Sequence, residues 1–94
     1  MKYYQQGDVL LKQCEKPKNV EILKTNILVS GQNDHLLKGK FKIGKAGNDI
    51  FVHSRGCTVV HSEHKPIVVQ EGFYVLGHVQ EFDHFLEESR KVID

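Results

Sequence analysis

The sequence predicts a small all-β domain, a partly open antiparallel barrel or β-roll of about six to eight strands. Two observations lead to this fold class. Eight glycines divide the 94 residues into short segments, and several of these segments are rich in the β-branched and aromatic residues that favour strands. Many short strands joined by short turns are typical of sheets that close or roll up. We expect one domain, residues 1–94, because two halves would each be too small for a core.

Turn residues separate the predicted strands in the first half of the chain. Gly7-Asp8 is a turn ahead of a strand at residues 9–11. The alternating apolar pattern of residues 20–29 predicts a second strand. Lysines alternate with other residues over positions 38–43, which predicts a further strand, and residues 44–48 predict a turn.

The second half of the chain predicts two pairs of strands and a C-terminal segment that is either a short helix or an extended tail. Residues 50–53 and 57–61 predict strands paired across the three residues between them. Residues 67–70 and 73–80 predict a second pair across a short Glu-Gly turn. The apolar residues of 82–94 fit either a short helix, because three of them have helical spacing, or an extended tail.

Composition excludes several classes of protein. No apolar run approaches the roughly 20 residues of a membrane span, so we expect no membrane contact. The N-terminus lacks a basic segment followed by an apolar one, which is the pattern of a secretory signal. Two cysteines, Cys14 and Cys57, are too few for a disulfide framework and predict reduced thiols in a cytoplasm. We expect Cys57 to be a small buried residue of the core.

Lysines are concentrated in the first half of the chain. Residues 1–45 hold nine lysines and four acidic residues, whereas residues 46–94 carry a net negative charge. Lys38, Lys40 and Lys42 fall on one face of a predicted strand. Such a stripe is one ingredient of nucleic-acid binding, but lysines also prevent an edge strand from pairing with other molecules. The net charge of only +1 favours the edge-strand interpretation, so we expect no nucleic-acid partner.

Three histidines are the candidate site residues. His61 and His64 flank a predicted turn that contains Glu63, and His35 follows a polar loop at residues 30–34. Neutral imidazole binds zinc well, and catalytic zinc sites often use three protein ligands plus water. If the rings converge, they form a zinc site with Glu63 as a further ligand or a general base. His-x-x-His outside a helical HExxH motif is a weak signal, and the alternative is histidines exposed at strand ends.

Several short motifs occur in a characteristic order: QQGDVLL, SGQNDHLL, VVHSEHKPIVVQEGFYVLGHVQEFD and SRKVID. In this order they resemble a largely uncharacterised group of small proteins from bacterial and phage genomes, over the chain from Gln6 to Asp94. The chain departs from that group at Phe82, where the group has tyrosine, and in having one histidine in the loop where a second is often found. The resemblance implies a phage or mobile-element origin, with the protein in the host cytoplasm or the virion, and it implies no reaction. The motif positions that match the group are Gln6, Gly7, Asp8, His35, His61, Glu63, His64, Gly72, Tyr74, Gln80, Glu81, Asp83 and Asp94.

Two functions agree with these observations. The first is a non-enzymatic accessory or binding protein that acts through protein–protein contacts, alone or as a homo-oligomer, and that needs no cofactor. The second is a small zinc-dependent hydrolase with His35, His61 and His64 as ligands and Glu63 as base. The size of the domain favours the first, because a ligand cleft typically measures about 300 Å³ or more and the filled interior of a small barrel has little room for one.

Overall fold

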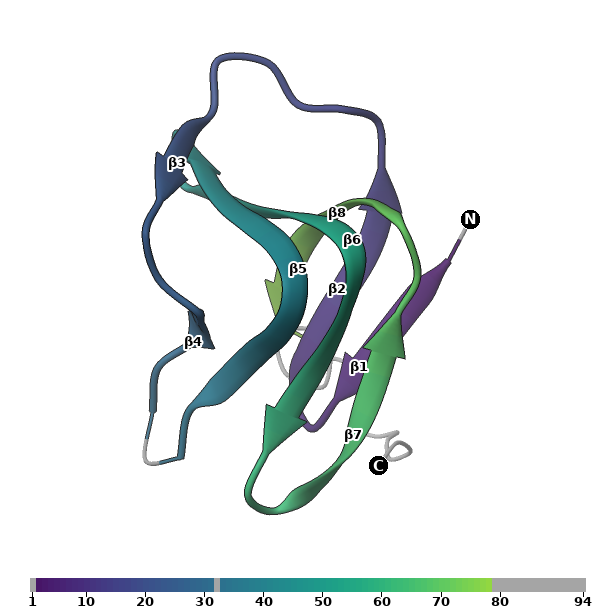
Figure 1. Cartoon of the computed structure of the whole chain (residues 1–94). Coiled ribbons are helices and arrows are strands. Elements are labelled where there is room, and N and C mark those ends of the chain that lie inside the picture. Colours follow the sequence, from purple (N-terminus) through teal and green to yellow (C-terminus); the bar gives the residue numbers. More distant parts are fainter. Residues whose placement is uncertain (1, 32, 79–94) are drawn as a thin grey trace, which may run out of the picture.

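The computed structural model describes residues 2–31 and 33–78, and over them it confirms the predicted all-β class. Eight antiparallel strands form a single sheet that is not closed (Figure 1). No helix with the length and apolarity of a membrane span occurs in the described part of the chain. The predicted C-terminal helix or tail, at residues 82–94, lies outside the described residues. The strands are β1 Tyr3–Gln6, β2 Val9–Cys14, β3 Glu21–Leu23, β4 Ile27–Val29, β5 His35–Ala46, β6 Asp49–His61, β7 His64–Val69 and β8 Gly72–His78.

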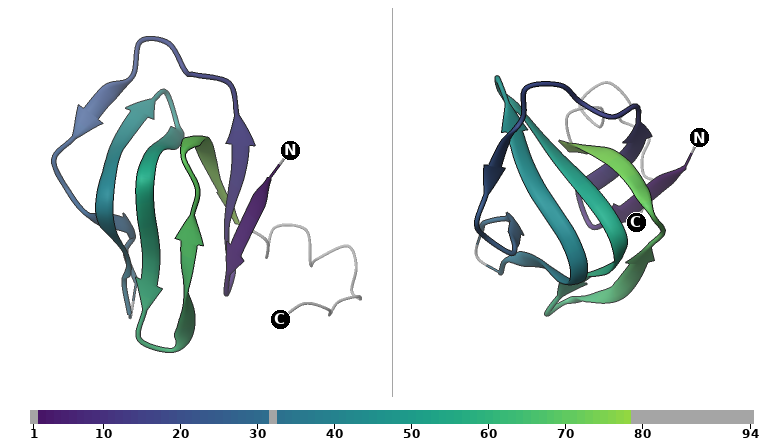
Figure 2. Two further views of the ribbon diagram at one scale, coloured as in Figure 1. Left: turned by 45° about the vertical axis from the view of Figure 1, so that its right-hand side comes forward. Right: turned by 45° about the horizontal axis from the view of Figure 1, so that its top comes forward.

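The two long strands, β5 and β6, hold the sheet together, because each changes its neighbour halfway along. The main strand order is β1-β2-β8-β6-β5-β3, with β4 paired to β5 and β7 paired to β6. The first half of β6 pairs with β8, and its second half pairs with β7. In the same way β5 pairs with β4 near its start and with β3 near its end. The sheet therefore curls into the partly open barrel seen in Figure 2.

A bend at two glycines replaces one predicted turn. Residues 50–53 and 57–61 are not two strands paired across residues 54–56; they belong to the single strand β6. Gly39 and Gly56 both have a φ of 109°, and the register of β5 against β6 shifts just after Gly39. A Cβ at Gly39 would lie 2.6 Å from the carbonyl oxygen of Gly56. Glycine inside a strand marks a bulge or a close backbone approach as readily as a turn, and this is why the prediction was wrong.

Other predicted strands have different limits or partners. Residues 20–29 form two strands, β3 and β4, and the hydroxyl of Thr25 accepts a hydrogen bond from the Ile27 N–H in the break between them. The predicted pair of residues 67–70 and 73–80 is wrong, because β7 and β8 each pair with β6 instead of with each other. The turn predicted at residues 44–48 is confined to Gly47 and Asn48.

The lysines of β5 lie where that strand has a sheet neighbour on one side only. β5 pairs with β6 over most of its length, but on its other side it pairs with β4 at His35 and Leu36 and with β3 at Ile43 to Lys45. Over the described residues, Lys38, Lys40 and Lys42 fall between these two pairings with exposed side chains, and their role in protecting an edge stays a prediction.

The core fills the concave side of the sheet. Tyr74 is fully buried, and its hydroxyl donates a hydrogen bond to the Gln70 carbonyl at 2.9 Å. Cys57 is buried, as predicted, and neither Cys57 nor Cys14 forms a disulfide. The buried apolar residues are Val9, Leu11, Leu28, Leu37, Ile43, Val52, Cys57, Val59, Val69 and Tyr74.

Candidate functional site

The structure brings the three predicted histidines together at one end of the sheet. His35 is the first residue of β5, His61 is the last of β6 and His64 is the first of β7. Because β5 and β7 both pair antiparallel to β6, these strand ends meet, and His61 lies opposite His64 in the ladder. The ring centroids of His35 and His61 are 4.2 Å apart, those of His61 and His64 4.7 Å, and those of His35 and His64 6.1 Å. We call these three residues the histidine cluster.

The His35 ring is held in one orientation by Gln6. Both side chains are almost wholly buried, and Nδ1 of His35 lies 2.8 Å from Oε1 of Gln6. The Gln6 amide nitrogen donates to the carbonyl oxygens of Val59 and Lys65, at 3.2 and 2.9 Å. Its amide oxygen must therefore face His35, whose Nδ1 carries the proton. Because a neutral imidazole carries a single N–H, the free lone pair of the neutral His35 ring is on Nε2.

Burial also keeps the His35 ring neutral. Desolvation lowers the pKa of His35 below its ordinary value of 6.5, and the neighbouring rings of His61 and His64 lower it further. The carboxylates of Asp8 and Asp34 oppose these effects without reversing them. A neutral imidazole is the form that binds a metal ion.

The His61 ring joins the β6–β7 turn to the loop before β5. Its Nδ1 accepts a hydrogen bond of 3.0 Å from the backbone N–H of Glu63. Because a backbone N–H is always a donor, the His61 proton must be on Nε2, which lies 3.1 Å from the Asn33 carbonyl oxygen. His61 is thus also neutral in this arrangement.

The His64 ring lies against the turn between β1 and β2. A Cβ added at Gly7 would come within 2.7 Å of Nε2 of His64, and Gly7 has a φ of 62°. Gly7 and Asp8 form a turn, as predicted. Glycine at this position therefore gives the turn its conformation and leaves room for the His64 ring.

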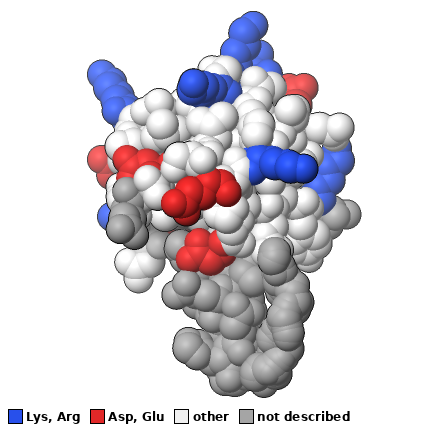
Figure 3. Space-filling view, turned by 90° about the horizontal axis from the view of Figure 1, so that it is seen from below, with Lys and Arg blue, Asp and Glu red and all other residues white. Residues whose placement is uncertain are grey.

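Acidic side chains lie beside the histidine cluster. Asp8 and Glu63 line a depression of about 250 Å³ together with His35 and His61. Figure 3 shows the molecule from this end, with acidic side chains at the centre and on the left of the face and basic ones mostly at the top and on the right. Over residues 2–31 and 33–78, no three or more His, Cys, Asp and Glu side chains are already arranged to hold a metal ion. The predicted residues are therefore adjacent, while the His61 nitrogens are both engaged in protein hydrogen bonds.

Gln6 was not identified from the sequence as a site residue. It is one of the motif positions that match the resembled group, whereas the motif positions Gln80, Glu81 and Asp83 lie outside the described residues. Gln6 connects β1 with His35 of β5 and with carbonyls of β6 and β7. A buried glutamine at the end of a strand carries no sequence signal of these long-range contacts.

A second candidate site lies at the other ends of β5 and β6, on the outer face of the sheet. Phe73, His53 and Lys42 are direct cross-strand partners on β8, β6 and β5, so their side chains share one face. They alternate with core residues such as Val52 and Tyr74, and that face is therefore the one turned away from the core. The rings of His53 and Phe73 stack with centroids 4.1 Å apart and planes at 16°.

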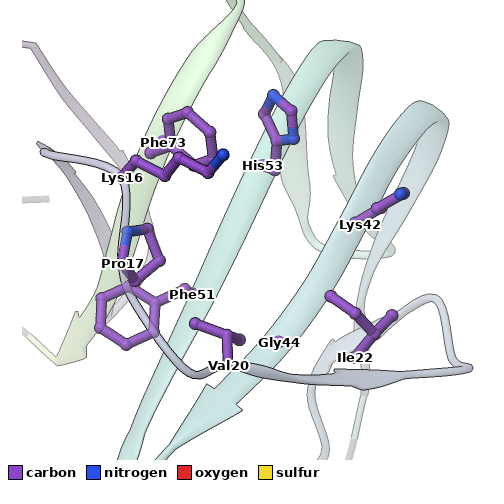
Figure 4. Close-up of a pocket in the computed structure, with 9 residues that line it drawn as sticks. All are labelled: Lys16, Pro17, Val20, Ile22, Lys42, Gly44, Phe51, His53 and Phe73. Atoms are coloured by element: carbon purple, nitrogen blue, oxygen red, sulfur yellow. The ribbon is translucent and has the colours of Figure 1, made fainter.

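The β2–β3 connection turns this face into a groove. The segment carrying Pro17 and Val20 passes across the strands (Figure 4). Val20 packs on Gly44 of β5 so closely that no Cβ would fit at Gly44. The groove measures about 300 Å³, and since it lies outside the barrel, the expectation that a filled interior leaves no room does not apply to it. This outer-face groove is lined by Lys16, Pro17, Val20, Ile22, Lys42, Gly44, Phe51, His53 and Phe73.

Comparisons with known proteins add no relative to this description. No family model matches the chain, and neither a curated protein nor a solved structure is significantly similar to it.

Proposed function

We propose that this chain is a non-enzymatic binding protein that recognises an acidic segment with apolar anchors through the outer-face groove. The observation that carries the proposal is the apolar character of this face. A sheet with one face on the core usually presents polar residues on the other. Here Phe51, Phe73 and Pro17 form a partly buried apolar surface instead. Apolar surface in a concave site rimmed by polar residues is typical of interaction sites.

The charges around the groove support an acidic partner. Lys16 and Lys42 are exposed at its margin, and no acidic residue is among the described residues that line it. Complementary charge guides association and selects among partners, whereas buried aromatic surface supplies most of the affinity. The best-matched ligand is therefore a peptide with aromatic or aliphatic side chains for the groove and carboxylates for the two lysines.

The chain itself contains a segment with this composition. Residues 81–88, EFDHFLEE, combine four acidic residues with Phe82, Phe85 and Leu86. A second copy of the chain could therefore supply the ligand, in agreement with the expected homo-oligomer. This segment also provides a defined probe for the groove.

A peptide-binding measurement tests the proposal. The receptor is the full chain carrying Phe82→Ser, Phe85→Ser and Leu86→Ser, so that its own segment does not compete. The probe is a fluorescent peptide of residues 79–94, and fluorescence anisotropy reports binding. We expect saturable binding that weakens as salt rises, because the lysines are exposed. A matched peptide with the four acidic residues of 81–88 replaced by amides should bind at least about tenfold more weakly.

Groove variants locate the binding surface. Phe73→Ser and Lys42→Glu should each weaken binding by about tenfold or more. Lys65→Glu is the matched control, because Lys65 is an exposed lysine on β7 that does not line the groove. The proposal is wrong if a receptor with an unchanged melting curve shows no saturable binding, or if Lys42→Glu and Lys65→Glu have equal effects. Sedimentation of the unmodified chain then shows whether a second copy is the partner.

A further inference from the structure

We propose that His35, His61 and His64 together bind one divalent transition-metal ion, best matched by zinc, and that Gln6 is a positioning residue for this site. The histidine cluster lies at the opposite ends of β5 and β6 from the outer-face groove. The metal site therefore does not depend on the proposed peptide binding, and either can fail without the other.

The spacing of the rings fits a shared ion. In a tetrahedral zinc site each imidazole nitrogen is about 2.0–2.1 Å from the metal, which places ring centres roughly 5 Å from one another. The three centroid separations in the cluster are 4.2, 4.7 and 6.1 Å. The strands thus bring the rings to about these distances, while the ring planes lie only 15–42° from one another, so the rings must turn before their nitrogens meet at one ion.

His35 has the arrangement of a metal ligand with a supporting residue. Metal-binding histidines almost always donate their other ring N–H to an oxygen, which fixes the tautomer and the ring orientation. The Nδ1–H of His35 donates to the amide oxygen of Gln6, and the Gln6 amide nitrogen is held in turn by two backbone carbonyls. Nε2 of His35 is therefore the nitrogen that would bind the ion.

His61 offers its lone pair on Nδ1. Its Nε2–H donates to the Asn33 carbonyl, a supporting contact of the same kind as that of His35. Metal binding through Nδ1 keeps this contact and releases only the hydrogen bond from the Glu63 N–H. Glu63 lies in an exposed turn, where water replaces the lost acceptor.

The remaining features of the site also favour a cation. His64 is exposed, so its ring turns at little cost. Asp8 and Glu63 line the adjoining depression and add negative charge next to the three rings. The fourth ligand is then water or one of these carboxylates.

Metal titration of the full-length chain tests the site. Zinc binding is measured by isothermal titration calorimetry, and Co²⁺ is used as a spectroscopic probe of tetrahedral nitrogen coordination. We expect one ion per chain, an intense visible Co²⁺ spectrum that zinc abolishes, and a higher melting temperature with zinc. An absence of stoichiometric binding, or binding with an octahedral Co²⁺ spectrum, would overturn the proposal.

Single variants separate this site from general histidine affinity for metals. His64→Gln is the most direct variant, because His64 is exposed and its replacement should leave the fold intact. It should abolish the tetrahedral Co²⁺ spectrum and weaken zinc binding by more than the roughly 10–100-fold expected for a supporting residue. His53→Gln, which changes a histidine of the outer-face groove, should leave both unchanged. Equal effects of the two variants would contradict the assignment.

The role of Gln6 has its own measurement. Gln6→Glu keeps an oxygen acceptor for His35 but loses the amide donor, whereas Gln6→Leu loses both. If Gln6 orients His35, zinc affinity should fall by roughly 10–100-fold in Gln6→Leu and by less in Gln6→Glu, at a temperature where both variants are folded. Unchanged affinity in folded Gln6→Leu would show that its role is structural only.

Discussion

Nδ1 of His35 lies 2.8 Å from the amide oxygen of Gln6, although the two residues are 29 positions apart in the chain. This contact belongs to a buried network in which Gln6 also binds the carbonyls of Val59 and Lys65. The described strands β1 and β7 lie in contact but do not pair in the sheet. The Gln6 side chain joins these two unpaired strands through the Lys65 carbonyl, so one glutamine both connects β1 to β7 and sets the orientation of a candidate ligand.

The first prediction concerns the stability supplied by this network. Gln6→Leu should lower the free energy of unfolding by at least about 2 kcal/mol, because His35 and the Val59 carbonyl remain buried without a partner and each such group costs roughly 1–3 kcal/mol. Urea unfolding measures the change. Gln5→Leu is the matched control, since Gln5 is exposed and its side chain, within the described part of the chain, bonds only to the nearby Gly7 carbonyl. A cost for Gln6→Leu no greater than that of Gln5→Leu would contradict the role of the network.

The second prediction concerns the packing that forms the outer-face groove. Gly44→Ala forces Val20 away from β5 and should cost about 1–3 kcal/mol, as overpacking usually does. In the Val20→Ala background the same change should cost less, with a coupling energy of about 0.5 kcal/mol or more. Gly77→Ala is the control, because a Cβ at Gly77 meets no atom within 4 Å. Additive effects of the two changes in thermal unfolding would show that Val20 does not pack on Gly44.

The third prediction concerns alkaline stability. Burial, together with the neighbouring Tyr4 and Cys57, raises the pKa of Tyr74 to about 12. The folded state therefore holds the Tyr74 proton more tightly than the unfolded state, whose tyrosine titrates near 10. This contribution is complete below pH 10 and is lost as pH rises from 10 to about 12.

The measurement is the pH dependence of unfolding, with tyrosinate absorbance recorded in parallel. Tyr74→Phe should flatten the fall in stability between pH 10 and 12. Tyr3→Phe, which changes an exposed tyrosine, should leave the slope as it is. An equal slope in wild type and Tyr74→Phe would refute the assignment.

The fourth prediction concerns the two thiols. Burial raises the pKa of both Cys14 and Cys57; Glu15 adds to the effect at Cys14, and a hydrogen bond with Ser54 opposes it at Cys57. The thiolate is the reactive form, and Cys57 is also closed off by the core. In Cys14→Ser protein, Cys57 should therefore react with a thiol reagent only at the rate of opening, whereas Cys14 in Cys57→Ser protein should react faster. Similar rates in the two folded variants would argue against a sealed core around Cys57.

The local sequence pattern was sufficient to predict the fold class and the positions of several turns. Alternating β-branched residues around glycines identified an all-β domain, and the turn residues at Gly7-Asp8 and between His61 and His64 lie where they were predicted. Cys57 was expected in the core and is buried there. These features depend on backbone conformation and side-chain period, which neighbouring residues determine.

Pairing and bending were decided by contacts between distant residues. Gly56 had the local character of a turn, but the close approach of Gly39 makes it the bend of a continuous strand. β7 and β8 adjoin in the chain, yet both pair with β6 because that strand is long enough for two neighbours. Such choices depend on which partner buries more apolar surface, and this is a property of the whole sheet.

The sequence alone determined the residues of the histidine cluster, because His35, His61 and His64 stand beside turns where strand ends leave polar side chains accessible. The tertiary structure alone places the three ring centroids 4.2 to 6.1 Å apart, since this requires β5 and β7 to flank the same end of β6. The outer-face groove depended entirely on tertiary structure. In the sequence, Phe51 and Phe73 have the pattern of ordinary strand residues. The path of the β2–β3 connection across them depends on contacts between distant residues, which no local pattern predicts.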